Sequence, residues 1–273
     1  MIQEIEPMQF INSYEPKSIP YDEDYALIYE NGEMVFKNSK YECFTIGDTK
    51  KLFGNVQYRY LFSIDDMHFF LAEGADVSEY KTRKKIIQLR DTNPQWLGFA
   101  GACGAQLMNW YHRTRYCGAC GKEMKHSESE RAMVCPYCNN TVYPNIAPAV
   151  IVALYSGDRI LLTKYAHGPY KRYALIAGYT EFGETIEETV SREVMEEVGL
   201  KVKNIRYFGS QPWPFSGTQL MGFITELDGN DKIRMDKDEL SVAEWKNRDE
   251  LVPEENPRSL TNTMIQAFRK GEF

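Results

Sequence analysis

The stretch GYTEFGETIEETVSREVMEEVGL, from Gly178 to Leu200, is the one around which the rest of the chain is organised. A glycine-flanked turn leads into a run from Thr185 to Val198 that is predicted to be helical. At 100° per residue, side chains three and four positions apart share a face of a helix. The helix therefore carries three carboxylates on one side, those of Glu193, Glu196 and Glu197.

A second face of the same helix is apolar. It carries Val190, Val194 and Val198, and a stripe at this spacing predicts that the helix rests on a hydrophobic core. Carboxylates held this close together repel one another and raise one another's pKa, so a counter-charge is needed. Mg²⁺ and Mn²⁺ prefer oxygen ligands and supply that charge. The alternative interpretation is a solvated acidic helix face, as in other Glu-rich stretches.

The spacing of the fixed residues is more specific than either interpretation requires. The pattern is G-x5-E-x7-R-E-U-x-E-E-x-G-U, with U aliphatic, and it is met at Gly178, Glu184, Arg192, Glu193, Val194, Glu196, Glu197, Gly199 and Leu200. Arg192 is placed to orient one of the acids, Gly178 to permit a tight entry into the loop, and Gly199 to end the helix. The stretch resembles the Nudix box. That resemblance implies a loop–helix–loop that binds divalent metal and hydrolyses a diphosphate linked to another moiety.

Length, composition and net charge limit the number of domains and the class of protein. The chain has 273 residues, of which 43% are hydrophobic and 13% aromatic, and this length predicts at least two domains. The net charge of −7 argues against a broad nucleic-acid-binding or anionic-membrane surface. The first ten residues lack the features of a signal peptide, and the apolar run 147–155 is too short to span a bilayer. We expect a soluble, cytoplasmic protein.

Three regions follow one another along the chain, and together they predict an α+β protein. Residues 1–95 are expected to form a strand-rich N-terminal domain with two hairpins, one turning at Asn31-Gly32 and one at Asp65-Asp66. Residues 96–143 are expected to form a helix and a zinc ribbon. Residues 144–273 are expected to form the Nudix domain, an α/β/α sandwich with a mixed sheet.

The predicted ribbon rests on two C-x-x-C pairs. Cys117, Cys120, Cys135 and Cys138 supply four thiolates, which is enough to close a tetrahedral zinc site with a structural role. Gly121 and Asn139 follow the second cysteine of each pair and are residue types that tolerate a left-handed turn. With four thiolates available, His126 is expected to face solvent. A nucleic-acid-binding ribbon is the alternative, although Glu123, Glu128 and Glu130 dilute the nearby Lys122, Lys125 and Arg131.

A further stretch of sequence limits which diphosphates are candidate substrates. Ser210-Gln-Pro-Trp-Pro-Phe215 places two prolines around a tryptophan and predicts a stiff aromatic surface loop, for which packing against the neighbouring domain is the alternative role. With the ribbon, the YPxIAPxxI passage from Tyr143 to Ile151 and the box, this loop makes the chain similar to the bacterial NADH pyrophosphatase subfamily of Nudix hydrolases. The resemblance implies a zinc-bearing homodimer that cleaves NAD(H) to nicotinamide mononucleotide and AMP. Some members also remove NAD caps from RNA 5′ ends.

The resemblance also implies roles for particular residues. Glu193, Glu196 and Glu197 match the catalytic, metal-binding acids of the box, and Glu239 matches a further acid for Mg²⁺ or Mn²⁺. The implied substrate contacts are Tyr143, Tyr179, Gln211, Trp213, Phe215 and Thr261. The chain departs from the family pattern at Ser216–Gln219, at Ser259-Leu-Thr261, and at Tyr179, where the family commonly has phenylalanine. These departures bear on the preference among NADH, NAD⁺, ADP-ribose and capped RNA.

The mechanism that follows is metal-assisted attack of water on phosphorus, with Glu196 or Glu197 as general base. Two alternative functions fit the same residues. One is hydrolysis of another dinucleotide such as ADP-ribose. The other is a sensor that keeps the Nudix fold and binds a nucleotide without catalysis, against which the intact set of acids argues.

Overall fold

The computed structural model describes residues 1–168 and 171–273, and their contacts divide into two compact units. The first unit contains residues 2–145 together with Pro214–Ser216. The second contains Met1, 146–213 and 217–273. Within the described residues, no helix is both long and apolar enough to cross a membrane.

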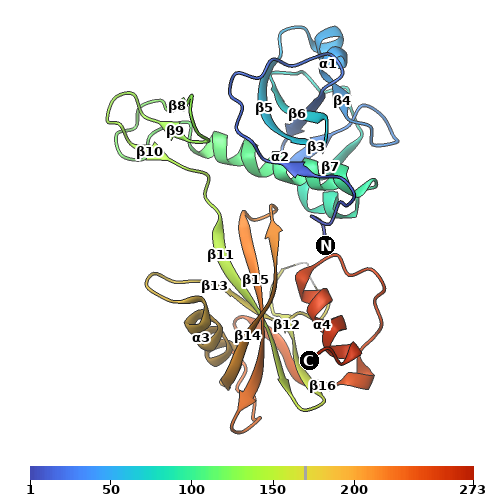
Figure 1. The fold of residues 1–273 in the computed structure, drawn as a ribbon, viewed down its shortest axis with the longest axis vertical. Helices are drawn as coiled ribbons and strands as arrows, with labels where there is room; N and C mark the ends of the chain where they lie inside the picture. The colour runs from blue at the N-terminus through green and yellow to red at the C-terminus, as the bar shows by residue number, and fades with distance from the viewer. Residues whose placement is uncertain (169–170) are drawn as a thin grey trace. The chain divides into compact units, whose positions relative to one another are not determined.

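The first unit is built on a seven-stranded sheet (Figure 1). Its strands, in pairing order, are β1 (Phe10–Ile11), β5 (Gln57–Ile64), β6 (Met67–Glu73), β2 (Tyr25–Glu30), β3 (Glu33–Val35) and β7 (Arg83–Lys85), with β4 (Phe44–Thr45) also paired to β2. Both predicted hairpins are present. Asn31 and Gly32 have φ of 52° and 78°, and Asp65 has φ of 48°, the left-handed conformations that tight turns between strands require.

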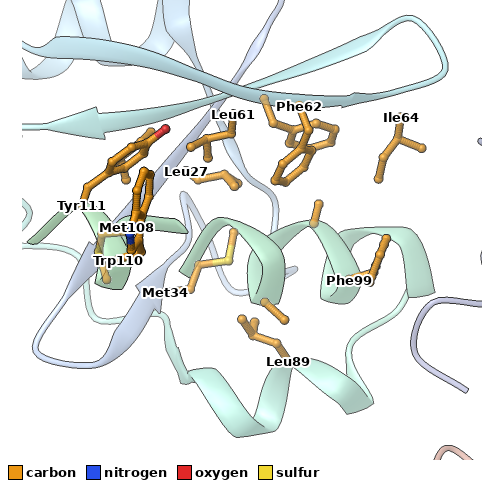
Figure 2. Packing of buried hydrophobic residues seen from close by; sticks show 14 of the residues in the cluster. Leu27, Met34, Leu61, Phe62, Ile64, Leu89, Phe99, Met108, Trp110 and Tyr111 are labelled. Carbon is orange, nitrogen blue, oxygen red and sulfur yellow. The ribbon is translucent and has the colours of Figure 1, made fainter. Parts of the chain in front are cut away.

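Three helical elements accompany this sheet: α1 (Ile46–Phe53), the 3₁₀ helix η1 (Ile86–Asp91) and α2 (Gln95–Arg113). Figure 2 shows the core between the sheet and α2, where Leu27, Leu61 and Phe62 point from the strands toward Met108 and Phe99 on the helix. A Cβ added at Gly104 of α2 would lie 2.5 Å from the Tyr29 hydroxyl. Helix and sheet approach so closely that only glycine fits at this position.

The predicted zinc ribbon follows α2 as a three-stranded sheet. Its strands are β8 (Lys125–His126), β9 (Met133–Val134) and β10 (Thr141–Val142), in the order β10-β9-β8. His126 is half-buried, whereas the sequence predicted that it faces solvent. Its ring lies 4.9 Å from that of Tyr111 at the end of α2, and burial together with the charge of Arg59 lowers the pKa of His126 to about 4.

The second unit is a six-stranded mixed sheet between two helices (Figure 1). Its strands are β14 (Lys201–Trp213), β15 (Thr218–Asp228), β11 (Ala147–Ser156), β12 (Arg159–Tyr165) and β16 (Leu240–Asn247) in pairing order, with β13 (Ile176–Tyr179) paired to β11. Among the strands that the structure describes in this sheet, β11 and β15 are the one parallel pair. The helices are α3 (Ile186–Val198) and α4 (Leu260–Lys270), and the 3₁₀ helix η2 (Arg248–Glu250) follows β16.

Each face of this sheet has its own core. Val190, Val194 and Val198 of α3 are fully buried against one face, as the apolar stripe predicted, and α4 covers the other. The predicted α+β class, with an α/β/α sandwich around a mixed sheet, a strand-rich N-terminal region and a four-cysteine ribbon, is therefore confirmed.

One prediction about local structure is wrong. Ser210–Trp213 continues strand β14, whereas the sequence suggested a surface loop. Proline has no N–H to donate to a neighbouring strand. It is tolerated at position 212 because β14 is an edge strand, which is paired with β15 on one side only. Phe215, in the tip that follows, packs against the core of the first unit.

Candidate active site

The helix that carries the three glutamates begins and ends where local signals place it. Thr185 caps the N-terminus, because its hydroxyl accepts from the Glu188 N–H while the Glu188 carboxylate accepts from the Thr185 N–H. Gly199 ends the helix in the left-handed conformation, with φ of 67°. The register of Glu193, Glu196 and Glu197 is thus fixed at both ends.

Gly178 lies under one of these glutamates. A Cβ added at Gly178 on strand β13 would lie 1.9 Å from Cδ of Glu193, so the carboxylate packs directly on the strand backbone. Gly178 is not among the residues with positive φ. The absent side chain provides the space that Glu193 occupies, a role that the sequence prediction of a tight entry into the loop did not include.

Arg192 connects the acids. Its guanidinium donates to Glu184 at 2.5 and 3.0 Å, to Glu193 at 2.7 Å and to Glu196 at 2.9 Å, and it also donates to the Tyr179 carbonyl. The hydrogen bond from Arg192 lowers the pKa of Glu184 to about 2. Glu184 and Arg192 therefore form a bidentate ion pair that holds the loop from 179 to 184 against the helix.

Glu197 is the most buried of the three, with 3% of its surface exposed. Its Oε1 accepts from the Ala177 N–H at 3.4 Å, and its Oε2 is buried without a hydrogen-bond partner among the described residues. Burial, together with the charges of Glu193, Glu239 and Asp236, raises the pKa of Glu197 to about 8. Burial, together with the charges of Glu196 and Glu239, also raises the pKa of Glu193, although Arg192 opposes this shift.

This arrangement suits a cation. A buried carboxylate oxygen without a donor is costly, and a divalent metal that prefers oxygen ligands would remove that cost. Glu193 and Glu197 lie on the inner face of α3, Glu196 is exposed, and Glu239 is exposed in the segment before β16. The segment is held to α3 by the N–H groups of Arg234 and Asp236, which donate to the carbonyls of Val198 and Glu197.

Asp236 was not singled out from the sequence. Its charge acts on Glu197, and the signal that could have identified it is the acidic run Asp236-Lys-Asp-Glu239. Among the described residues, the four ribbon cysteines are the one potential metal-binding cluster whose ligand atoms all lie within 4.8 Å of one another. The carboxylate oxygens of the box are farther apart than this.

The four ribbon cysteines fit zinc. The Sγ atoms of Cys117 and Cys138 are 3.6 Å apart, and those of Cys120 and Cys135 are 3.5 Å apart. A tetrahedral site with Zn–S bonds of about 2.3 Å separates the sulfurs by about 3.8 Å. As predicted, Gly121 and Asn139 adopt left-handed turns, with φ of 71° and 59°.

The predicted substrate contacts are spread over both units. Tyr143, in the first unit, is 55% exposed and donates to Glu130. Tyr179 is 52% exposed at the end of β13, and its hydroxyl lies 3.2 Å from that of Thr218. Trp213 ends β14, and Thr261 lies in the first turn of α4. Both are partly buried.

Gln211 occupies a different environment from the other predicted contacts. It is fully buried, its Oε1 accepts from the Leu260 N–H at 2.8 Å, and its Nε2 donates to the Arg258 carbonyl at 3.5 Å. The side chain therefore binds the backbone at the start of α4. With none of its surface exposed, Gln211 is not placed to contact a substrate in this structure.

Sequence-family models identify the class of protein that this fold and site define. A NUDIX domain model matches residues 145–268, and the NADH pyrophosphatase zinc ribbon domain matches residues 112–143. Together with the relatives described next, these matches show that the chain belongs to the Nudix hydrolase family, in the group that carries this zinc ribbon.

Two similar proteins are NAD-capped RNA hydrolases called NudC. The protein of Escherichia fergusonii is 41% identical over 181 residues, covering 66% of this chain and 70% of the relative. That of Pectobacterium atrosepticum is 38% identical over 198 residues, covering 72% and 74%. For the relative from Photorhabdus laumondii, 45% identical, the matched segment spans only 60% of its length. Among solved structures, a NUDIX hydrolase from Nitrosomonas europaea is similar with a TM-score of 0.48 and 21% identity, covering 58% of this chain and 92% of that one.

Loss of a zinc ligand is expected to unfold the ribbon. Cys135 is fully buried in the ribbon, and structural zinc sites supply much of the folding energy of such small modules. Cys135→Ser is expected to lower bound zinc and to make residues 112–143 susceptible to limited proteolysis. Cys103→Ala, at a cysteine of α2 outside the ribbon, should keep its zinc. Full zinc content in Cys135→Ser would contradict the assignment.

The raised pKa of Glu197 predicts a pH dependence of stability in protein free of Mg²⁺ and Mn²⁺. Between about pH 5 and 8 the folded state keeps a proton that the unfolded state has released. The free energy of unfolding should therefore fall as pH rises, by at most about 1.4 kcal/mol per pH unit for one proton. Urea denaturation at several pH values measures this slope. Glu197→Gln should flatten it, and an unchanged slope in the variant would refute the prediction.

Proposed function

We propose that the chain is a metal-dependent pyrophosphatase that hydrolyses the diphosphate of NAD(H) to nicotinamide mononucleotide and AMP, and that it removes NAD caps from RNA 5′ ends. The observation that carries the proposal is the buried Glu197 carboxylate, whose Oε2 lacks a partner among the described residues, on the helix of a complete Nudix box. The substrate class is supported by the NADH pyrophosphatase ribbon and by the names of the NudC relatives.

Glu193, Glu196, Glu197 and Glu239 would hold Mg²⁺ or Mn²⁺. A bound cation would neutralise charge on the diphosphate and would make the attacking water more acidic. The protein's own residues position the carboxylates that would bind the cation. Gly178 lets Glu193 sit against β13, the Ala177 N–H orients Glu197, and Arg192 fixes the loop that precedes the helix.

Two residues are candidates for the general base that takes a proton from the attacking water. Glu196 is exposed and its Oε2 accepts from Arg192, whereas Glu197 is buried. The pH–rate profiles of Glu196→Gln and Glu197→Gln distinguish them, because removal of the base eliminates the acidic limb of the profile.

For the substrate, we propose contacts at Tyr143, Tyr179, Trp213, Phe215 and Thr261. Tyr179 has an exposed ring on a strand end that Arg192 holds in place, and an aromatic face suits stacking on a base. The family resemblance further supports a homodimer. Four of the six cysteines form the cluster that fits zinc, a use of cysteine typical of intracellular proteins, and this supports the proposed cytoplasmic location.

A substrate panel tests this function. NADH, NAD⁺, ADP-ribose, diadenosine polyphosphates and NAD-capped RNA are each incubated with Mg²⁺ or Mn²⁺, and the products are resolved. The proposal predicts kcat/KM values for NADH and NAD-capped RNA above that for ADP-ribose. A clear preference for ADP-ribose would favour the other dinucleotide activity, and binding without turnover of any substrate would favour a sensor.

A further inference from the structure

Two tyrosines project from the cysteine end of the zinc ribbon. Tyr137 is 72% exposed and Tyr116 is 59% exposed. Tyr116 precedes Cys117 and Tyr137 precedes Cys138, and the Sγ atoms of these two cysteines are 3.6 Å apart. Both rings therefore flank the same metal-binding cluster, on a part of the ribbon that the cluster makes rigid.

Cations accompany both rings. The Arg115 guanidinium lies 5.5 Å from the ring centre of Tyr116, and the Lys122 ammonium lies 5.8 Å from that of Tyr137. We call these four residues the tyrosine face. A Cβ added at Gly118 would meet no atom within 4 Å, so the chain around the face is open.

The charge of the ribbon differs in sign from that of the whole protein. Residues 112–143 contain five Lys or Arg and three Glu, a net charge of +2 in a chain of net charge −7. From the sequence, we expected the three glutamates of the ribbon to offset the charge of its basic residues. In the structure, however, Glu128 and Glu130 lie in the turn between β8 and β9, where Glu128 pairs with Lys17 and Glu130 accepts from Tyr143.

The tyrosine face keeps its positive charge as a result. Glu123 is the acid nearest to it in sequence, and it pairs with Arg115 at 3.6 Å. Lys122 forms no ion pair within the described residues. The face therefore combines two exposed aromatic rings with one cation, Lys122, that is unpaired in the part of the chain that the structure describes. Single-stranded nucleic acid binds to such a combination, because bases stack on the rings and cations contact the phosphates.

We propose that the tyrosine face binds single-stranded RNA without sequence preference. This inference rests on the proposed function, because the RNA that would bind here is the RNA that carries the NAD cap. The tyrosine face would be a second binding site for that RNA, separate from the Nudix box. Stacking on Tyr116 and Tyr137 makes the affinity independent of base identity, and Lys122 makes it dependent on salt. A second copy of this chain is the competing occupant of the face.

Fluorescence polarisation of a labelled, uncapped single-stranded RNA of about 12 nucleotides tests the proposal directly, because site sizes of this order are typical. The variants are Tyr137→Ala and the double variant with Tyr116→Ala. We expect the Kd to rise at least about 5-fold for the single variant, and further for the double one. Tyr137→Phe keeps a stacking ring and should bind like wild type. Lys122→Gln should reduce the slope of log K against log salt by about 0.7.

Controls separate this proposal from misfolding and from the activity. Tyr21→Ala removes a tyrosine that is 65% exposed outside the ribbon and should leave the Kd unchanged. Zinc content shows whether each ribbon is folded, and turnover of free NADH tests the activity independently. Wild-type RNA affinity in Tyr137→Ala would overturn the proposal. So would a shift in sedimentation coefficient with unchanged RNA affinity, because the face would then belong to a contact between copies.

Discussion

Glu197→Gln is expected to lower kcat for NADH by at least about 10²-fold while the protein remains folded. The amide keeps the shape of the side chain and preserves the bond from the Ala177 N–H to Oε1. It removes the negative charge that a divalent cation requires. The measurement is steady-state turnover with saturating Mg²⁺ and, separately, Mn²⁺.

Stability should change in the opposite direction. Because Glu197 is 3% exposed and its pKa is raised to about 8, ionising it in the absence of metal costs folding free energy. Metal-free Glu197→Gln is therefore expected to melt at a higher temperature than wild type at pH 8, as found where active sites hold strained groups. Glu187→Gln, at an exposed position of the same helix, should change neither quantity. Full activity in Glu197→Gln would exclude the proposed metal site.

Gly178→Ala is the second change with a large expected effect. The added Cβ would lie 1.9 Å from Cδ of Glu193, so the carboxylate must move away from β13. A displacement of about 1 Å at a catalytic group costs about 10²-fold in rate, and we expect a loss of that order in kcat/KM. The overpacking should also destabilise the protein by about 1–3 kcal/mol.

Gly209→Ala is the matched control for this change. Gly209 also lies in a strand of the same sheet, but its added Cβ would meet only a Leu260 methyl group at 4.0 Å. Turnover and urea denaturation of both variants separate the effect on the site from the general effect of alanine in a strand. If Gly178→Ala were as active as Gly209→Ala, Glu193 would not need its position against the strand.

The parts of the structure that the sequence predicted are those with local causes. Helix α3 follows from the Thr185 cap, the Gly199 terminator and the valine stripe, all within its own span. The ribbon follows from its cysteine spacing, and the hairpins follow from Asn31-Gly32 and Asp65-Asp66.

The parts that were missed depend on residues distant in sequence. Gln211 owes its burial to Leu260, 49 positions away, and His126 owes its environment to Tyr111 and Arg59. Pro212 fits a strand only because β14 lies at the edge of the sheet. The role of Gly178 depends on the position of Glu193 across the helix–sheet contact. No periodicity or spacing rule reports such contacts.

The most direct test of the account is the hydrolysis of free NADH with Mg²⁺ or Mn²⁺, with products resolved by chromatography, in wild type and in Glu197→Gln. The account predicts equal amounts of AMP and reduced nicotinamide mononucleotide from wild type, dependent on the metal, and formation of both products at least about 10²-fold more slowly by the variant. Absence of both products from wild type, or their formation at the wild-type rate by Glu197→Gln, would contradict it.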